Sequence, residues 1–497
     1  MELWQNLPLL MIVLPLMCAV ISSVLPGKGA RGLMTGLSLF SLLAMGFLLW
    51  QVNKEGASYI YVMGEIGAPF GNELRIGVTE CLIGLLFMLV LVVSILGGWR
   101  RLTRDVAPNR MHLYGVMVCL LISAVTAITF TNDLFTAYVF IEISTIAAGT
   151  LISATNQGRT LFASTRYMIM NLLGSGMFLL GLSILYSLTG QLLFPQIEKS
   201  VSALLAEENY AVPLALCCVL MTLGIACKSA LYPFHTWLPN AYASATPTSS
   251  ALLSSMISKM YIFLLIKIFF RAAGSQVFER GISDILFVFS IVGIILGSVD
   301  AIREHHFSRM IAYSSVSQIG YIFLGISLGT DAGMAAALFH ILAHSAAKSM
   351  LFLSANKLRE VSGDSDAFRD IRASGLRAPL AGLAFAIGAC SLVGIPLLGG
   401  FTSKVFLARA GLEMEAWKMI ALLLTLALST ALNAAYLLRT TLTLYRPGER
   451  YPLEKSVLAK DKPFTAAMML LIGLNVILGI FGGNVMDLIY KGIAMFN

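Results

Sequence analysis

Residues 338–348 read Leu-Phe-His-Ile-Leu-Ala-His-Ser-Ala-Ala-Lys, inside an apolar run that extends over residues 333–356. The run is long enough to cross a bilayer, because a spanning helix takes about 20 mostly apolar residues. His340, His344 and Lys348 follow at intervals of four, so a helix stacks all three on one face over about 12 Å of its length. The stretch predicts a membrane-spanning helix with a column of ionisable groups on one side.

The composition of the whole chain agrees with this local pattern. Of the 497 residues, 58% are hydrophobic and only 12% are charged, whereas a soluble domain carries about a quarter charged residues. This balance excludes a water-soluble globular protein and a disordered chain. The net charge of +8 is typical of cytoplasmic loops that face anionic lipid. We therefore expect lipid contacts and no nucleic-acid partner.

Apolar windows, separated by charged or Pro- and Gly-containing breaks, predict an all-α polytopic membrane protein with about fourteen transmembrane helices. The predicted spans are residues 7–25, 33–51, 78–98, 112–130, 133–153, 163–188, 211–231, 246–270, 284–302, 309–328, 333–356, 378–406, 418–444 and 464–487. The least distinct boundary lies at residues 130–133, where only Thr131-Asn132-Asp133 marks the break between two spans.

Basic residues are distributed unevenly between the predicted loops. Loops after odd-numbered spans hold 20 of them: Lys28, Arg31, Arg100, Arg101, Arg104, Arg110, Arg159, Arg166, Arg303, Arg309, Lys357, Arg359, Arg369, Arg372, Arg377, Arg446, Arg450, Lys455, Lys460 and Lys462. Loops after even-numbered spans hold 6: Lys54, Arg75, Lys199, Arg271, Arg280 and Lys418. Because basic loops stay in the cytoplasm, we expect the odd loops inside and both termini outside.

Seven ionisable residues fall within or beside the predicted spans, where each costs about 2.5–3.5 kcal/mol on insertion scales. They are Glu142, Lys228, Lys259, His340, His344, Lys348 and Lys404. We expect these groups to face one another and water. Histidine, and lysine when buried, can exchange protons near neutral pH, so the column on residues 333–356 is interpreted as a proton relay. The alternative is a pair of hydrogen-bonded core histidines.

Glu142 and Lys228 suggest how such a relay is controlled. At about 4 Å and an effective dielectric constant of 20, opposite charges attract by about 4 kcal/mol. Moving or neutralising the glutamate would therefore change whether the lysine keeps its proton. A static structural ion pair is the alternative.

Two spans are interrupted beside a lysine: Pro233 follows Lys228, and Pro396 precedes Lys404. Interrupted spans in matching positions are typical of repeated transporter halves. We expect two inverted five-helix repeats, spans 4–8 and 9–13, with spans 7 and 12 broken; two unrelated kinks are the alternative. Lys267 and Arg271, at the end of span 8, are expected to snorkel to the membrane interface.

These repeats divide the chain into four parts. Residues 1–110 hold helices 1–3, residues 111–271 the first repeat and residues 284–445 the second repeat, and residues 446–497 hold a cytoplasmic loop and helix 14.

The sequence predicts no cofactor and no metal. The seven cysteines form no C-x-x-C pair and have no zinc or iron–sulfur spacing. A phosphate-binding G-x-x-x-x-G-K-[ST] motif is missing as well. His340 and His344 lie one turn apart on one helix, so they cannot sandwich a haem iron. No catalytic or redox centre is identified, which leaves open whether the chain belongs to an enzyme.

Several longer motifs carry a family resemblance. They are Lys-Ser-Ala-Leu-Tyr-Pro-Phe-His-Thr-Trp-Leu-Pro (228–239), Ala-Thr-Pro-Thr-Ser-Ser-Ala-Leu-Leu (245–253), Ile-Ala-Tyr-Ser-Ser-Val-Ser-Gln-Ile-Gly (311–320) and the stretch 338–348. In this order they resemble the proton-translocating, antiporter-like subunits of respiratory complex I, Mrp-type Na⁺/H⁺ antiporters and membrane-bound hydrogenases. The resemblance covers about residues 110–445. One departure is His306-Phe-Ser308-Arg309, where the family usually has an Asp-x-Lys-Arg run.

The resemblance implies fourteen helices, inverted five-helix repeats and a central hydrophilic axis. It assigns the family's glutamate to Glu142, its lysines to Lys228, Lys259 and Lys404, and the relay to His340, His344 and Lys348. It further implies a subunit without redox chemistry of its own, in a prokaryotic cell membrane. Its partners would be other membrane subunits, with a hydrogenase or a ferredoxin or NADH module among the candidates. The alternative function is a self-sufficient cation/proton antiporter.

Overall fold

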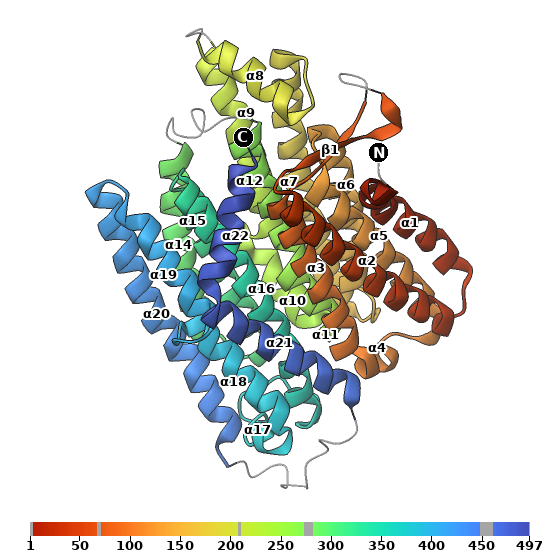
Figure 1. Ribbon diagram of the computed structural model, residues 1–497. Helices are drawn as coiled ribbons and strands as arrows, with labels where there is room; N and C mark the ends of the chain where they lie inside the picture. The colour runs from red at the N-terminus through yellow and green to blue at the C-terminus, as the bar shows by residue number, and fades with distance from the viewer. Residues whose placement is uncertain (1–2, 67–70, 207–209, 273–281, 448–460, 497) are drawn as a thin grey trace.

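The computed structural model describes residues 3–66, 71–206, 210–272, 282–447 and 461–496. Within these ranges the chain is mostly helical (Figure 1). Helices predominate because, in a bilayer, a helix satisfies its backbone hydrogen bonds within the segment itself. The two strands described, β1 (Tyr59–Val62) and β2 (Glu73–Ile76), form an antiparallel hairpin in which Tyr59 pairs with Ile76.

The first three predicted spans are confirmed as helices. They are α1 (Leu7–Val24), α2 (Gly27–Glu55) and α3 (Val78–Gly97), accompanied by the short helices η1 (Leu3–Asn6), η2 (Met63–Glu65), α4 (Trp99–Asp105) and η3 (Pro108–Arg110). Large apolar side chains on α1 and α2 are exposed, among them Val20, Val24 and Leu43. Exposed apolar faces of this kind fit contact with lipid or with another membrane subunit.

Residues 111–271 contain the first broken helix. The elements are α5 (Met111–Phe130), α6 (Leu134–Ile152), α7 (Gly158–Thr189), α8 (Phe194–Leu205), α9 (Ala211–Ser229), η5 (Phe234–Trp237), α10 (Leu238–Ser244), α11 (Pro247–Leu252), η6 (Leu253–Ile257) and α12 (Ser258–Arg271). The predicted break beside Lys228 is confirmed, because α9 ends at Ser229 and Ala230 adopts a left-handed conformation with φ 63°.

Residues 284–445 contain the second broken helix. The elements are α14 (Ile282–Arg303), α15 (Phe307–Ile326), α16 (Asp331–Glu360), α17 (Ser374–Arg377), α18 (Pro379–Val393), α19 (Gly399–Leu412) and α20 (Ala416–Tyr445). The predicted break beside Lys404 is confirmed as well, since α18 ends at Val393 and Gly394 follows with φ 95°. The inverted relation between the two halves stays a prediction.

The last predicted span, residues 464–487, runs across a bend. There, α21 (Lys462–Ile480) ends, Phe481 interrupts the helix, and α22 (Gly482–Ala494) follows. Much of the predicted loop before α21 lies outside the described residues, as do the basic residues Arg280, Arg450, Lys455 and Lys460.

Twelve helical segments among the described residues are long and apolar enough to cross a membrane. The two other predicted spans coincide with α15 and with the broken pair α18–α19. α15 is rich in serine and tyrosine, and neither α18 nor α19 is long enough to cross alone. The chain is therefore a multi-pass membrane protein, and the total of fourteen crossings stays a prediction.

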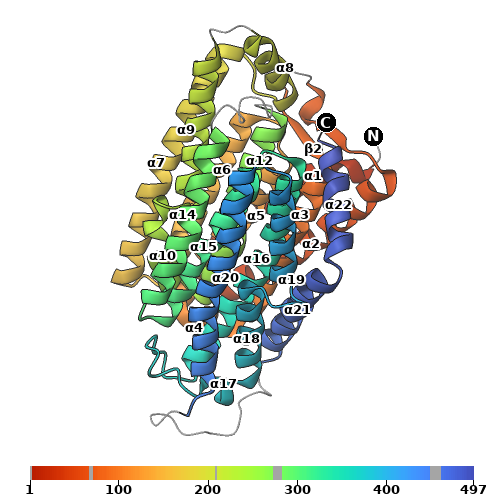
Figure 2. The same cartoon turned by 90° about the vertical axis from the view of Figure 1, so that its left-hand side faces the viewer.

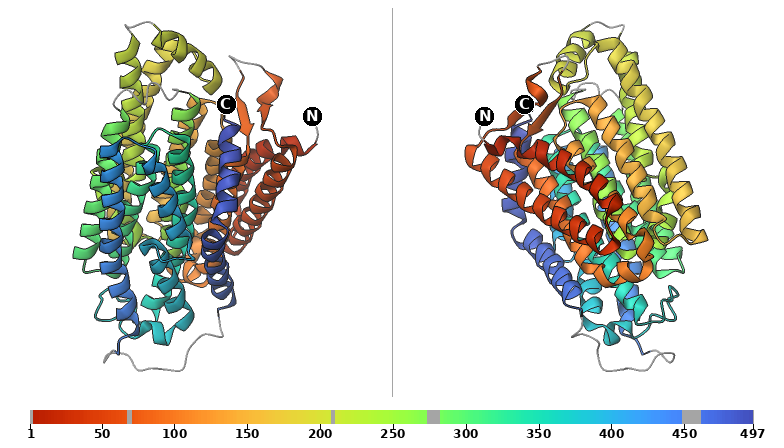
Figure 3. Two further views of the ribbon diagram at one scale, coloured as in Figure 1. Left: turned by 60° about the vertical axis from the view of Figure 1, so that its left-hand side comes forward. Right: turned by 90° about the vertical axis from the view of Figure 1, so that its right-hand side faces the viewer.

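The helices form a bundle with two distinct ends (Figures 1 and 2). Both termini, the β1–β2 hairpin and α8 lie at one end, which we call the termini face (Figure 3). α4 and α17 lie at the other end, the loop face. α16 and the segment Pro247–Arg271 have fully buried apolar cores, so they form the interior of the bundle.

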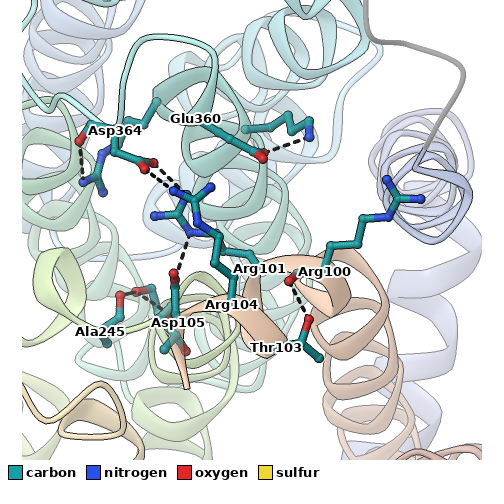
Figure 4. Close-up of polar contacts among 12 residues, drawn as sticks. Arg100, Arg101, Thr103, Arg104, Asp105, Ala245, Glu360 and Asp364 are labelled. Carbon is teal, nitrogen blue, oxygen red and sulfur yellow. Dashed lines mark hydrogen bonds and ion pairs between the residues drawn. The ribbon is translucent and has the colours of Figure 1, made fainter. Parts of the chain in front are cut away.

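The loop face is tied together by arginine–aspartate pairs (Figure 4). Arg101 Nη1 lies 2.6 Å from Asp364 Oδ1, and Arg104 Nη2 lies 2.9 Å from Asp364 Oδ2. Arg101 Nε also pairs with Asp105 of its own helix at 2.9 Å. These contacts join the segment after α3 to the segment after α16, so the basic residues of the loop face have a structural use.

The snorkelling prediction for Lys267 and Arg271 is wrong. Lys267 is fully buried and Arg271 is 6% exposed. Arg75, predicted as a loop residue, is buried too, at 4% exposed. The hairpin and the C-terminal residues cover the end of α12, because Arg75 donates a hydrogen bond to the Met495 carbonyl oxygen and the Phe496 ring lies against Arg271. A side chain near a span end cannot reach the interface when the fold covers it.

Candidate functional site

The pair Glu142–Lys228 forms one end of the buried charged axis. Glu142 Oε1 on α6 lies 3.8 Å from Lys228 Nζ at the end of α9. The lysine is fully buried, whereas the glutamate side chain is 27% exposed. Lys228 Nζ also donates a hydrogen bond to Thr145 Oγ1 at 2.8 Å and lies 5.4 Å from the centroid of the Tyr261 ring. Three different groups therefore hold the ammonium position, and one of them carries a negative charge.

Close helix packing places Lys228 there. Gly174 on α7 and Gly224 on α9 face each other, and a Cβ atom on Gly224 would lie 2.9 Å from the Phe178 backbone nitrogen. Only glycine allows this approach of the two backbones. At the break after α9, Trp237 Nε1 donates to the Cys227 carbonyl oxygen at 3.0 Å and satisfies a carbonyl at the helix end.

Lys259 lies at the start of α12, directly after a π-helical turn, η6. Its Nζ donates a hydrogen bond to the Ser254 carbonyl oxygen within that turn, and the side chain is fully buried. π-helical turns widen the backbone locally and often occur at functional sites. The turn that precedes Lys259 contacts α16 directly, because Ser345 Oγ donates to the Ser255 carbonyl oxygen at 2.6 Å and Ser349 Oγ donates to Ser255 Oγ at 2.9 Å. Lys259 therefore lies next to the α16 column.

The column on α16 has the stacking that the spacing predicted. The rings of His340 and His344 lie parallel to within 26°, with centroids 5.9 Å apart. His340 Nδ1 lies 3.0 Å from Ser403 Oγ, and Lys348 Nζ donates to Ser314 Oγ at 2.5 Å. Among the described residues, His340 Nε2 and both ring nitrogens of His344 have no hydrogen-bond partner. These nitrogens are therefore buried polar atoms that the described residues leave unpaired.

Lys404 forms the other end of the axis. Its Nζ donates to the Val393 carbonyl oxygen at 2.8 Å and to Thr430 Oγ1 at 3.1 Å. The Val393 carbonyl is available because α18 stops there. The Tyr321 ring connects Lys404 to the α16 column, since its centroid lies 5.3 Å from Lys404 Nζ and 5.2 Å from the His340 ring centroid.

Six of the seven predicted residues are therefore buried in the core of one bundle, and Glu142 lies at its edge. Direct contacts connect Glu142 to Lys228, and His340 to Lys404 through Ser403 and Tyr321. Between these ends the axis passes from Lys228 to α12, where Tyr261 and Lys259 lie two residues apart. The axis contains four lysines and one carboxylate. An uncompensated buried charge costs several kcal/mol, so protonating all four lysines at the same time would be costly.

The sequence reasoning missed the uncharged members of the axis. These are Thr145, Ser254, Tyr261, Ser314, Tyr321, Ser403 and Thr430. Four of them lie within five residues of a predicted ionisable residue, and Ser314 and Tyr321 belong to the polar α15. Hydroxyl groups close to an intramembrane charge, and serine clusters in an otherwise apolar span, would have identified most of them.

A cavity of about 220 Å³ lies at the loop face. Arg101, Arg104 and Arg359 lie along it, and Tyr242 and Phe352 form part of its lining. The Phe352 ring centroid lies 6.0 Å from Lys348 Nζ. Phe352 therefore lies next to both the cavity and Lys348.

No group of three or more His, Cys, Asp or Glu side chains that could hold a metal ion occurs within the part of the chain that the structure describes.

A multi-pass helical bundle with a buried row of lysine, histidine and glutamate defines an ion-translocating type of membrane protein. The family model described as "NADH:quinone oxidoreductase/Mrp antiporter, TM" matches residues 131–430. The chain therefore belongs to this family.

Relatives of several kinds resemble the chain over most of its length. NADH-quinone oxidoreductase subunit N of Desulforudis audaxviator is 30% identical over 90% of this chain and 88% of its own length. A Na(+)/H(+) antiporter subunit of Alkalihalophilus pseudofirmus is 26% identical over 78% of this chain and 77% of its own. A chain of the archaeal membrane-bound sulfane sulfur reductase, a respiratory membrane complex, superposes with a TM-score of 0.86 at 25% identity, covering 99% of this chain and 98% of that chain.

Proposed function

We propose that this protein is a proton-translocating subunit of a multisubunit membrane complex. The observation that carries the proposal is the row of buried ionisable groups from Glu142 to Lys404. A transported solute or metal ion would need a ligand pocket. The axis instead supplies lysine and histidine side chains, which are proton carriers.

In this proposal, protons move between Lys228, Lys259, His340, His344, Lys348 and Lys404, and Glu142 controls the first of them. The ammonium of Lys228 is stabilised while the Glu142 carboxylate stays 3.8 Å away. Neutralising or withdrawing that carboxylate frees the proton to move along α12 toward α16. The hydroxyl groups of Thr145 and Ser403, which contact Lys228 and His340, carry protons across distances that are too long for direct transfer between the ionisable groups.

Other membrane subunits are the proposed partners. Glu142 is partly exposed on a face of α6 where Phe135, Val139 and Ile146 are exposed as well. A carboxylate facing lipid at this depth is costly, so a neighbouring subunit is expected to cover it. The NADH-quinone oxidoreductase and Na(+)/H(+) antiporter relatives support a partner set of this type. Purification with native partners would identify the driving reaction.

We further propose a prokaryotic cell membrane as the location, with both termini outside. The basic loop face is then cytoplasmic, as the positive-inside rule requires. Cysteines introduced by Asp105→Cys and Ser365→Cys should react with a membrane-impermeant thiol reagent only from the cytoplasmic side. Asn72→Cys, near the hairpin, should react only from outside. The opposite pattern would reverse the orientation.

The direct test of the proposed function is Lys404→Ala in the assembled complex. Loss of a positioned proton carrier should reduce proton translocation on the order of 100-fold, while the complex still assembles. Proton flux is measured in proteoliposomes and divided by the amount of assembled complex. Wild-type flux in an assembled Lys404→Ala complex would refute the role of the axis.

A further inference from the structure

A second group of buried charges lies at the termini face, outside the axis described above. It contains Glu80 on α3, Arg75 on β2, and Lys267 and Arg271 on α12, all buried to more than nine-tenths. We call these four residues the termini-face cluster. Lys267 follows Lys259 by eight residues on the same helix, which is about 12 Å of helix rise. The cluster therefore lies between the axis and the termini-side surface.

Glu80 is the one carboxylate of the cluster. Its Oε1 accepts a hydrogen bond from Arg75 Nη1 at 2.6 Å. Its Oε2 is buried and has no hydrogen-bond partner among the described residues. Gly77 leaves room for this oxygen, because a Cβ atom there would lie 2.5 Å from Glu80 Oε2. Glu80 thus keeps one oxygen free to accept a proton.

Lys267 makes two hydrogen bonds, to the Thr129 carbonyl oxygen at 2.9 Å and to the Thr131 carbonyl oxygen at 2.6 Å. An ammonium group has three N–H donors, whereas a neutral amine has two and a free electron pair. Two carbonyl acceptors can therefore hold either form of Lys267. The Phe194 and Phe263 rings, with centroids 5.7 and 6.0 Å from Nζ, favour the charged form without fixing it.

The charges of the cluster do not balance when Lys267 is protonated, because three buried cations then face one anion. Arg271 Nε and Nη1 have no hydrogen-bond partner among the described residues. Arginine does not lose its proton in proteins, so Lys267 is the one basic member that can reduce the excess. Glu73 on β2 is half-buried and Glu198 on α8 is exposed, so Glu80 is the one fully buried carboxylate among these three.

We propose that Lys267 and Glu80 form a proton-exchange site at the termini-face end of the relay; this inference rests on the proposed function and deepens it. The ion-pair partner of Glu80 among the described residues is Arg75, so the ammonium of Lys267 gives its proton to the Glu80 carboxylate through water. This transfer leaves a neutral amine and a carboxylic acid. The acid releases the proton to water on the termini side. The amine's electron pair then accepts the next proton from the axis.

A purely structural role is the competing explanation. In that case Lys267 is a permanent cation that caps the carbonyl end of α5, and the cluster joins α3, α12, the hairpin and the C-terminal residues. Lysine near a helix C-terminus is favourable for this reason alone. The two explanations differ in whether Lys267 must release its proton.

The test is proton flux per assembled complex for Lys267→Arg and Lys267→Met. Arginine keeps the cation and the capping donors but cannot release a proton. Methionine keeps the length without the charge, but it leaves the Thr129 and Thr131 carbonyl oxygens without this donor, which is why flux is divided by the amount of assembled complex. Both variants should lose flux on the order of 100-fold, as expected for a lost proton carrier. Wild-type flux per complex in either variant would overturn the proposal.

Two controls complete the design. Lys418→Arg changes a lysine that is ion-paired with the half-exposed Asp284 and lies outside the cluster, so its flux should match wild type. Lys404→Ala is measured in the same assay. If Lys404→Ala pumps normally, the proposed function itself fails. If Lys404→Ala is inactive while the Lys267 variants pump normally, only the exchange site is refuted.

Discussion

The two ends of the axis hold their lysines in different ways. At one end Lys228 faces a carboxylate, Glu142, at 3.8 Å. At the other end Lys404 faces a backbone carbonyl, the Thr430 hydroxyl and the Tyr321 ring, all of them uncharged. Both lysines lie next to a helix break, so the difference is in charge and not in backbone design.

This difference indicates that the two ends of the axis have different functions. A carboxylate near a lysine changes the stability of its proton by several kcal/mol when it moves or is neutralised. The uncharged partners of Lys404 stabilise its protonated form over its neutral form by a smaller free energy. The Glu142–Lys228 end is therefore suited to control, and the Lys404 end to passing protons on without a strong bias.

The largest expected effect on proton flux comes from placing a carboxylate beside Lys404, so that both ends of the axis carry one. Thr430→Asp would give Lys404 a carboxylate close to the position of Thr430 Oγ1, now 3.1 Å from Nζ. An attraction of about 4 kcal/mol would hold the proton on Lys404 about a thousandfold more firmly. Proton flux through the complex should fall accordingly.

Thr430→Asn is the matched control, since it adds a polar group of similar size without charge. Its flux should stay within a few-fold of wild type. If the two variants pump equally well, the charge around Lys404 does not matter and the contrast between the ends has no functional meaning.

A smaller effect is expected at the two helix breaks. The left-handed position is taken by Gly394 beside Lys404 but by Ala230 beside Lys228. A left-handed conformation costs a non-glycine residue about 1–2 kcal/mol, and a Cβ atom on Gly394 would also lie 3.2 Å from Lys404 Cδ. Gly394→Ala should therefore lower the thermal stability of the complex.

The reverse exchange, Ala230→Gly, should change stability by about 1 kcal/mol or less, because relief of strain is offset by the greater freedom of glycine in the unfolded chain. Both variants are compared in thermal unfolding of the detergent-solubilised complex. Equal stability of Gly394→Ala and wild type would show that position 394 tolerates a side chain as position 230 does.

Much of the axis could be predicted because intramembrane charges are rare. Glu142, Lys228 and the α16 column stand out in apolar runs, and the cost of burial implies that such groups face one another. The helix breaks were predictable for a similar reason, since proline beside a lysine interrupts the span. Local pattern and global fold agree at these sites.

The termini-face cluster could not be predicted in the same way. Lys267 and Arg271 lie near a span end, where a long basic side chain usually reaches the interface. What buries them is non-local: the β1–β2 hairpin and residues 495–496 cover the end of α12. For α15 the difficulty is local. Its serine-rich sequence lowers the hydropathy of the segment, and a count of membrane spans depends on hydropathy.

The most direct test of the account is proton flux per folded complex in Glu142→Asp and Glu142→Gln. Aspartate keeps the charge but shortens the reach by about one methylene, and glutamine removes the charge. Charge control of Lys228 predicts the order Glu, then Asp, then Gln in transport rate at equal amounts of complex. A static ion pair predicts instead lower abundance or thermal stability for Glu142→Gln, with normal pumping by the protein that folds. Wild-type flux per folded Glu142→Gln complex would contradict the account.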